Sequence, residues 1–281
     1  MIVPRAGIAD IAAVAAHYDD LDDLYRSLWG INLHHGYWIT GKESPDEAVA
    51  NLTRLVARQA ALKPGDRVCD LGCGYGAAAI LWHRDIGAHV TGITISEKQY
   101  RYAKLAAAGD ARLDFILGDA QETALPSASF DVVTAIESSE HMRDKAKLII
   151  EAHRLLRPGG RCVIAAWLTR DRPNFWESRY LLDPICREGR LPSMASAAEY
   201  RSMLVAAGFH DIQVSDLTRQ VKHTWSVCAG RVIARFLRDP SFRRVLSDPR
   251  FTNRIFAKTV FRIWLAYQTG SMRFGLFAAQ K

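Results

Sequence analysis

The stretch Asp70-Leu71-Gly72-Cys73-Gly74-Tyr75-Gly76 decides the fold of this 281-residue chain. It follows a short apolar run, 67–71, that predicts a strand, and it precedes a segment, 77–84, that predicts a helix. Glycines let the backbone turn tightly and approach a ligand closely, and the N-terminus of a helix favours negative charge. A strand, a glycine loop and a helix in this order predict a ligand-binding crossover at the carboxyl edge of an α/β sheet.

The spacing within this loop narrows the kind of ligand. The third glycine is Gly76, so the pattern is G-x-G-x-G and differs from the G-x-G-x-x-G pattern of dinucleotide-binding folds. Asp70, directly before the glycines, is unfavourable for a pyrophosphate because both groups are negative. A carboxylate at this place suits a cation or a network of hydroxyl groups, such as the amino-acid end of S-adenosylmethionine.

Strands and helices alternate outward from the loop. Further strands are predicted at 89–93, 113–117, 130–136, 161–167 and 210–216, with helices at 96–108, 145–156 and 197–207. Pro158 and the two glycines after it end one of these helices and turn the chain into the next strand. The alternation predicts a doubly wound, Rossmann-like α/β fold with a parallel sheet. A seventh strand, 271–279, follows a helical insertion and is expected to form a reversed, antiparallel hairpin at the edge of the sheet.

The chain divides into three predicted regions. Residues 1–60 form a helical N-terminal flap, residues 61–167 form the cofactor-binding core, and residues 168–281 supply the rest of the core and a lid. The lid comprises an irregular, proline-containing segment at 168–195 and amphipathic helices at 217–268. The broad apolar stripe of these helices either packs on the core or walls a substrate pocket.

Composition limits the class of protein. Hydrophobic residues make up 49% of the chain and charged residues 24%, which is typical of a soluble globular protein. No apolar run reaches the ~20 residues that a membrane span needs, and the N-terminal stretch lacks the layout of a secretory signal. The five cysteines are scattered, which disfavours a metal site or a disulfide framework and fits a reducing compartment. We therefore expect a cytoplasmic protein without a bound metal.

Charge is concentrated in the last quarter of the chain. Residues 217–281 hold 13 Lys and Arg against two acidic residues, whereas the rest of the chain carries a net charge of −4. This basic quarter is either a solvated helix face or a surface that contacts an anionic membrane or a phosphorylated substrate. No zinc-finger or RNA-binding signature accompanies it, so nucleic acid is not an expected partner.

Two further motifs resemble those of class I methyltransferases. They are Gly118-Asp119-Ala120 after the third strand and Leu155-Leu156-Arg157-Pro158-Gly159-Gly160 before the fifth. The resemblance implies S-adenosylmethionine as cofactor, S-adenosylhomocysteine as product, and a hydrogen bond from the adenine amino group to Asp119. The cofactor contacts that it implies around these motifs are Asp70, Gly72, Cys73, Gly74, Gly76, Asp119, Ala120 and Gln121.

The end of the second strand departs from the common pattern. Many class I enzymes have an acidic residue there for the ribose hydroxyls, whereas this chain reads Gly92-Ile93-Thr94-Ile95-Ser96, followed by Gln99. This resembles the branch of the cyclopropane synthases and the sterol and tocopherol methyltransferases. It implies that Thr94, Ser96 and Gln99 contact the ribose or methionyl end of the cofactor. In the alternative interpretation they serve only as a helix cap and an exposed helix residue.

Aromatic and His side chains are dense between residues 17 and 38. This part includes Tyr18, Trp29 and the run His34-His35-Gly36-Tyr37-Trp38. It resembles the N-terminal flap of the tocopherol methyltransferases, which implies cofactor contacts for Tyr18 and His34 and acceptor contacts for His35 and Tyr37. The tryptophans are alternatively core anchors.

Titratable side chains follow the fourth strand, beside the expected methyl group, in the run Glu137-Ser138-Ser139-Glu140-His141. Imidazole titrates near neutrality and can take a proton from an acceptor hydroxyl or amine. We therefore predict His141 as the catalytic base, Glu140 as a group that orients it or acts itself, and Glu137 as a cofactor contact. Alternatively, Glu140 and His141 only organise the loop and the next helix.

The acceptor is expected to be small and hydrophobic. Lid aromatics, among them Trp176, Tyr180, Trp225 and Trp264, predict an enclosed apolar substrate. The resemblance implies a prenylated phenol, a terpenoid or an alkaloid, with carbon as the favoured methylated atom. The alternatives are a sterol-type or fatty-acyl C-methyltransferase, an N-methyltransferase and a cofactor-binding protein without catalysis.

Overall fold

The computed structural model describes residues 1–2, 34–247 and 254–281. Its centre is one sheet of seven strands in the order β3-β2-β1-β4-β5-β7-β6. The strands are β1 (Arg67–Leu71), β2 (His89–Thr94), β3 (Leu113–Leu117), β4 (Phe130–Ile136), β5 (Leu156–Thr169), β6 (His210–Asp216) and β7 (Met272–Gln280). Strands β1 to β5 pair in parallel, and β7 pairs antiparallel with β5 and β6. The predicted doubly wound α/β fold with an antiparallel last strand is confirmed.

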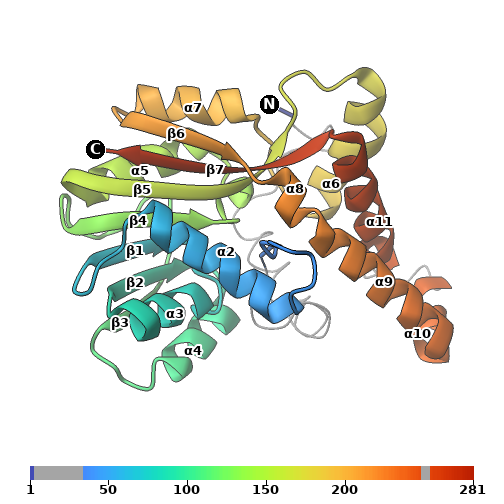
Figure 1. Ribbon diagram of the computed structural model, residues 1–281, viewed down its shortest axis with the longest axis horizontal. Helices are drawn as coiled ribbons and strands as arrows, with labels where there is room; N and C mark the ends of the chain where they lie inside the picture. The colour runs from blue at the N-terminus through green and yellow to red at the C-terminus, as the bar shows by residue number, and fades with distance from the viewer. Residues whose placement is uncertain (3–33, 248–253) are drawn as a thin grey trace.

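Helices cover both faces of the sheet. Helices α2 (Pro45–Gln59), α3 (Ala77–Ile86) and α4 (Glu97–Ala106) share one hydrophobic cluster, and α5 (Lys145–Leu155) and α7 (Ala197–Ala206) share another. Figure 1 shows α2 and α3 in front of the sheet, with α5 behind it. Large side chains such as Trp82 and Leu148 are fully buried in these clusters, and each contributes roughly 1.5–3 kcal/mol to folding.

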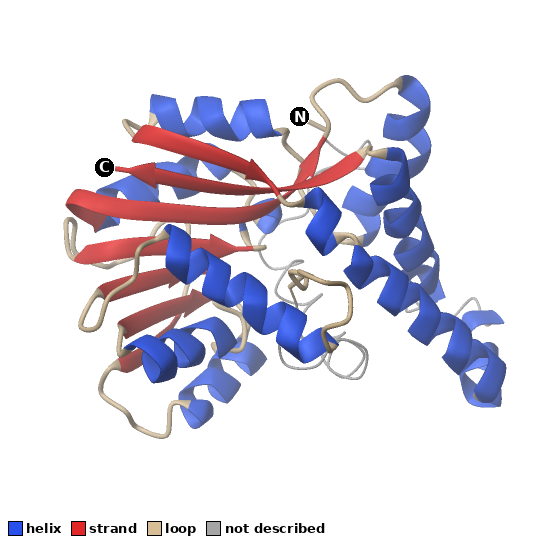
Figure 2. Ribbon diagram, viewed as in Figure 1, coloured by secondary structure: helices blue, strands red, loops and turns tan. Residues whose placement is uncertain are grey.

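A second group of helices extends past the carboxyl ends of the parallel strands. It comprises the π-helix η2 (Glu177–Leu182) and helices α6 (Asp183–Glu188), α8 (Thr218–Val221), α9 (His223–Arg238), α10 (Pro240–Ser247) and α11 (Arg254–Thr269). Figures 1 and 2 show α9 and α11 side by side at one end of the sheet, with α10 at the outer tip. This group corresponds to the predicted lid, and it lies next to the edge at which such folds bind ligands.

Side-chain caps fix the helices that begin at this edge. The Ser96 hydroxyl accepts from the backbone N–H of Gln99 at the start of α4, and Asp144 accepts from that of Lys147 at the start of α5. A short 3₁₀ helix, η1 (Ser139–His141), joins β4 to α5. Each cap contributes about 1 kcal/mol to stability, so the loops between strand and helix are held at defined positions.

Strand β7 forms with β6 the antiparallel pair that was predicted at the edge of the sheet. It pairs along its whole length with β5 and also with β6, which leaves β6 as the edge strand. Most residues of β7 are buried, whereas β6 is exposed along nearly its whole length. An apolar strand gains more from a central position, and a polar strand tolerates an unpaired edge.

Two predicted boundaries also differ. Strand β5 begins at Leu156 instead of residue 161, because Leu156 already pairs with Phe130 of β4, before a register shift after which Arg161 pairs with Val132. A Cβ on Gly160 would lie 3.1 Å from the Asp131 carbonyl oxygen, so the two backbones approach closely at this irregularity. The segment 168–195 contains η2 and α6, although its prolines predicted irregular structure. Pro184 lies in the first turn of α6, which continues directly from the π turn of η2, so its ring interrupts the i to i−4 bonding inside a continuous helical segment.

Candidate active site

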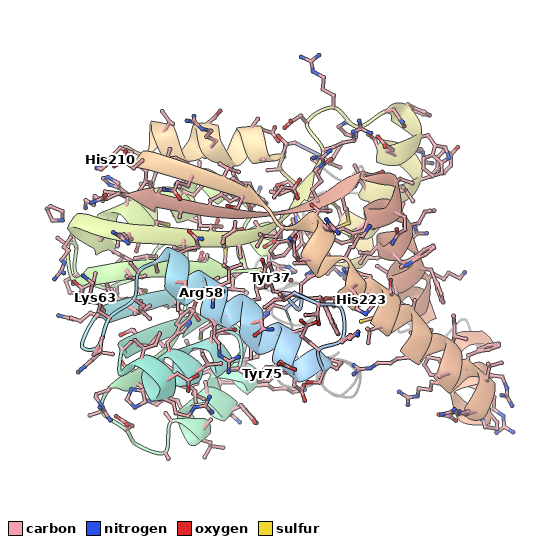
Figure 3. All side chains as sticks on the ribbon, viewed as in Figure 1. Tyr37, Arg58, Lys63, Tyr75, His210 and His223 are labelled. Atoms are coloured by element: carbon pink, nitrogen blue, oxygen red, sulfur yellow. The ribbon has the colours of Figure 1, made fainter. Side chains whose placement is uncertain are left out.

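A pocket opens where the parallel strands end, and four loops and the segment before α2 line it. Its wall includes the predicted cofactor residues His34, Asp70, Gly72, Cys73, Gly74, Thr94, Gln99, Ala120 and Glu137, and the predicted base His141. Figure 3 shows Tyr75, a further wall residue, and Tyr37 close to this edge of the sheet. Residues more than 100 positions apart in the sequence therefore meet at one cavity.

Asp70 at the end of β1 is the buried carboxyl group of the pocket. It is 2% exposed, and the Thr134 hydroxyl donates to its Oδ1 over 2.9 Å. Burial raises the pKa of Asp70 to about 7, and the Thr134 bond opposes this rise only in part. A buried carboxyl group whose ionised form is disfavoured gains a full charge when a cation or hydrogen-bond donors arrive. The site therefore suits a ligand with a positively charged or donor-rich end.

The three glycines of the loop have different surroundings. A Cβ on Gly72 would lie 2.3 Å from the Cβ of Ser138, and one on Gly76 would lie 2.6 Å from the Phe115 ring. Gly74 lines the pocket with φ +57° and no atom within 4 Å of its Cβ position. Gly72 thus gives close backbone packing, Gly74 leaves open space for a ligand, and Gly76 packs α3 on β3 without lining the pocket.

The loop after β2 presents a buried pair of polar side chains. The Thr94 hydroxyl donates to Oε1 of Gln99 over 2.9 Å, and both residues line the pocket. Because the amide oxygen is occupied, the Gln99 amide NH₂ is the group left for a ligand oxygen. Ser96 instead accepts from the Gln99 backbone over 3.2 Å and does not line the pocket. Its role in the structure is to cap α4.

Asp119 and Gln121 lie beside the pocket wall, which their neighbours Gly118 and Ala120 form. Asp119 is half-buried and accepts from the backbone N–H and the side-chain amide of Gln121, at 2.8 and 3.1 Å. Gln121 also accepts from the backbone of Asp144, at 3.1 Å. These bonds fix the carboxylate of Asp119 at the end of β3, where it can receive a donor from a ligand in the pocket.

Glu140 and His141 have separate surroundings. His141 lines the pocket, whereas Glu140 is 1% exposed and accepts from the backbone N–H of Trp167 in β5. Burial, together with the negative charge of Glu137, raises the pKa of Glu140 to about 8. Lys145 donates to the carbonyl oxygens of Glu140 and Met142, at 3.3 and 3.2 Å. The structure thus holds the His141 loop from both sides.

Glu137, directly after β4, has a strained backbone. Its φ of +48° is rare for a residue other than glycine and costs roughly 1–3 kcal/mol. Its carboxylate accepts from the backbone N–H and Nδ1 of His35, at 2.6 and 2.8 Å, and from the Trp167 indole, at 2.6 Å. Burial acts to raise the pKa of Glu137, but His35 and the Trp167 bond outweigh it, so the pKa lies below the ordinary value. The pocket therefore contains an ionised carboxylate.

The predicted acceptor residues are not gathered in one place. His35 and Trp225 are buried and bonded to each other, and Tyr37 packs half-buried against the core. Trp176 and Tyr180 are 47% and 55% exposed near η2, and Trp264 is exposed on α11; these three do not line the cofactor pocket. Tyr18 lies outside the described residues.

The sequence did not predict two residues that contact Glu137 or His35: Trp167 and Tyr267. Trp167 ends the predicted fifth strand, so its position at the carboxyl edge was a usable signal. Tyr267 lies 232 positions from His35 and belongs to the apolar stripe of α11. No local pattern distinguishes it from a core residue.

Within residues 34–247 and 254–281 no helix is long and apolar enough to cross a membrane. In the same ranges no group of three or more His, Cys, Asp or Glu side chains is placed to hold a metal ion.

Comparison with known proteins gives consistent results. Residues 69–164 match a family described as a methyltransferase domain. The chain is 38% identical over 218 residues to 27-O-demethylrifamycin SV methyltransferase of Amycolatopsis mediterranei, covering 76% of this chain and 79% of the relative. It is 31% identical over 296 residues to 2-methyl-6-phytyl-1,4-hydroquinone methyltransferase of Synechocystis sp., covering 99% and 90%. Among solved structures, the (4+2)-cyclase SpnF superposes with a TM-score of 0.82 at 26% identity, covering 100% of this chain and 99% of that chain.

Proposed function

Because this chain belongs to the class I S-adenosylmethionine-dependent methyltransferases, we propose that it methylates a hydroxyl group of a hydrophobic small molecule, with His141 as the base. That it is a methyltransferase of small molecules follows from its relatives. The identity of the acceptor, the methylated atom and the roles of the site residues are our proposal.

One observation carries this proposal. The wall of a single pocket contains both the residues suited to the cofactor and His141. Asp70 suits the cationic amino-acid end, the Gln99 amide suits a ribose or carboxylate oxygen, and Gly118 and Ala120 bound the part of the pocket nearest β3. His141 lies on the same wall, and an imidazole ordinarily titrates near neutral pH. His34 lines the pocket too, but its ring nitrogens contact the His35 carbonyl oxygen and the Thr53 hydroxyl, at 3.0 and 3.3 Å.

The chemistry needs little from the protein beyond position and proton removal. The cofactor supplies an electrophilic methyl group on a sulfonium. The protein has to hold the acceptor oxygen about 3–3.5 Å from the methyl carbon, in line with the breaking bond. Proton transfer from the acceptor hydroxyl to His141 would make the oxygen nucleophilic, and Lys145 would keep the His141 loop in place for this step.

The relatives favour oxygen over carbon. The resemblance to tocopherol methyltransferases implies methylation at carbon. The relative at 38% identity, however, is named for a substrate that lacks a methyl group on an oxygen atom. The relative at 31% identity is named for a prenylated hydroquinone, which also bears hydroxyl groups. A hydroxylated apolar acceptor is common to both names, and a deprotonated phenol is nucleophilic at oxygen and at its ring carbons.

A labelled-methyl screen tests this proposal. The purified protein would be incubated with radiolabelled S-adenosylmethionine and with prenylated hydroquinones, polyketide alcohols, sterols and amines, one class per reaction. We expect label in a hydroxylated class and a methoxy signal in the NMR spectrum of the product. A new C-methyl or N-methyl signal would contradict the oxygen assignment. Binding of S-adenosylhomocysteine without transfer to any class would favour the alternative of a cofactor-binding protein without methyl transfer. A similar solved structure is named as a cyclase and not as a methyltransferase.

We also propose a peripheral contact of the lid with anionic lipid and a cytoplasmic location. The apolar stripe of α9 is buried at Trp225 and Val232 but continues onto the outer half of the helix, where Ile233, Phe236 and Leu237 are exposed. Exposed basic residues occur on the same half of α9 and on α10. An apolar and basic surface of this kind favours the interface of an anionic membrane.

A further inference from the structure

One buried imidazole joins the cofactor pocket to the lid. His35 is 2% exposed. Its backbone N–H and its Nδ1 contact the Glu137 carboxylate, at 2.6 and 2.8 Å. On the opposite side of the ring, Nε2 lies 2.6 Å from the indole nitrogen of Trp225 in α9 and 3.1 Å from the hydroxyl of Tyr267 in α11. A single side chain thus contacts the pocket and both main lid helices.

The hydrogen bonds fix where the ring proton of His35 lies. An indole N–H can only donate, so Nε2 must accept from Trp225 and carries no proton. The proton is therefore on Nδ1, where it is donated to Glu137. In this tautomer the imidazole donates to the carboxylate, and its single Nε2 lone pair faces the Trp225 indole N–H and, at the longer distance, the Tyr267 hydroxyl. If the Glu137 carboxylate or the lid helices moved away from His35, a buried polar atom would lose its hydrogen bond, which is unfavourable.

Glu137 is the pocket end of this chain of contacts. Its carboxylate lines the cofactor pocket, and its backbone has the left-handed φ that a non-glycine residue keeps only when its surroundings hold it. Within the described part of the chain, two of the three donors to this carboxylate belong to His35, and the third is Trp167. The position of the carboxylate therefore depends mainly on where His35 is placed.

We propose that His35 is a positioning residue that couples helices α9 and α11 to the Glu137 carboxylate. The lid and the cofactor pocket then change together. The inference rests on the proposed function only in that the pocket holds the S-adenosyl cofactor. Glu137, Trp225 and Tyr267 are 102, 190 and 232 positions from His35, so the coupling is a property of the side chains and not of neighbouring sequence.

A neighbouring contact supplies a matched control. The Thr224 hydroxyl accepts from the backbone N–H of Gly36 and from the Trp38 indole, both at 3.0 Å. It therefore joins the same N-terminal segment to α9 without contacting His35 or Glu137. Thr224→Val loosens this contact and leaves the imidazole with all its partners.

A double-mutant cycle on the ligand-free protein tests the coupling without cofactor or acceptor. Thermal unfolding would be measured for wild type, Tyr267→Phe, Glu137→Gln and the double variant. We expect the loss of Tm in the double variant to be smaller than the two single losses together by roughly 2–4 °C. The cycle of Thr224→Val with Glu137→Gln should be additive within about 1 °C. Additive losses in the first cycle would overturn the proposal.

Hydrogen–deuterium exchange with S-adenosylhomocysteine as the probe tests the functional consequence. An Asn amide places its NH₂ near the position of Nδ1, so His35→Asn keeps the contact with Glu137. A Gln amide reaches the position of Nε2, so His35→Gln keeps the contact with Trp225. We expect the ligand to slow exchange in 223–238 and 254–269 of wild type and Thr224→Val, but in neither His35 variant. Slowed exchange of both helices in His35→Asn would overturn the proposal. Failure of the proposed function would be seen separately: the protein would transfer no methyl group, while the double-mutant cycle would still show coupling.

Discussion

The glycine loop after β1 and the pair of helices α9 and α11 serve the same end of the sheet in different ways. The loop shapes the pocket through its own backbone, with Gly72 against Ser138 and Gly74 open to the cavity. The helices act at a distance, because they reach Glu137 through His35. Changes in the loop region should therefore reduce cofactor affinity, whereas changes near the lid should alter turnover and packing.

The largest effect is expected at His141, which lies between the two regions. His141→Ala should reduce turnover by roughly 10²–10⁴-fold if the side chain is the base. The dissociation constant of S-adenosylhomocysteine should stay within about twofold of wild type. Initial rates with the acceptor found in the screen, together with calorimetry, measure both quantities. Turnover within a few-fold of wild type would show that another group removes the proton.

In the cofactor region, Asp70→Ala should weaken binding of S-adenosylmethionine by roughly 10–100-fold, because a charged hydrogen-bond partner is lost. Asp119→Ala should weaken it in the same direction. Isothermal titration calorimetry measures both, with Asp114→Ala, a change at an exposed aspartate on β3, as the control. Unchanged affinity in both variants would refute the assignment of the cofactor contacts.

The raised pKa of Asp70 predicts a pH dependence of binding. The free protein holds this group protonated below about pH 7, whereas a cationic ligand requires the ionised form. Affinity should therefore be constant above this pH and fall by about tenfold per pH unit below it. In Thr134→Val the bond that lowers the pKa is lost, so the midpoint should move to higher pH. Retention of the same pH profile in Asp70→Asn would assign it to another group.

A smaller effect is expected at Glu140. Since its pKa is raised to about 8, the group is mainly protonated at neutral pH, and an amide is close to it in shape and charge. Glu140→Gln should keep the bond from the Trp167 backbone and change turnover by only about twofold to threefold. A loss of two orders of magnitude would make Glu140 the base in place of His141, since Lys145 would still hold the loop.

The last prediction concerns lipid binding by the outer half of α9 and not catalysis. Phe236→Ser combined with Leu237→Ser should reduce sedimentation with phosphatidylglycerol vesicles by about three- to tenfold, because two exposed apolar side chains lose their contact with lipid. The matched change Leu105→Ser, at an exposed position on α4, should leave sedimentation unchanged. Equal binding of wild type to phosphatidylcholine vesicles would contradict a contact selective for anionic lipid.

Much of the cofactor region could be predicted because its signals are local. The bounds of β3 and β4 agree with the sequence prediction, since each strand is a short apolar or β-branched run bounded by turn residues. Asp70 and Gly74 of the glycine loop and Thr94 and Gln99 of the loop after β2 all line the pocket. Where local signals competed, as at Gly160 in β5, the prediction was wrong by several residues.

The lid could be predicted only as amphipathic helices. Tyr267 belongs to an apolar stripe whose other members, such as Val260 and Ile263, are ordinary core residues. Only the folded arrangement shows that its hydroxyl lies against His35. The left-handed backbone of Glu137 likewise arises from its partners, because nothing in its neighbours along the chain requires a turn there.

Lys145 has a consequence for anyone who wishes to redesign the acceptor range. Its ammonium group is almost fully buried and holds the carbonyl oxygens on both sides of His141, with Ser193 as a third partner at 2.9 Å. A mutant library that varies this lysine would mostly yield enzymes with a misplaced His141, whatever substrate they accept. Substitutions at Trp176, Tyr180 and Trp264 would leave this loop undisturbed, because their rings are exposed and do not line the pocket.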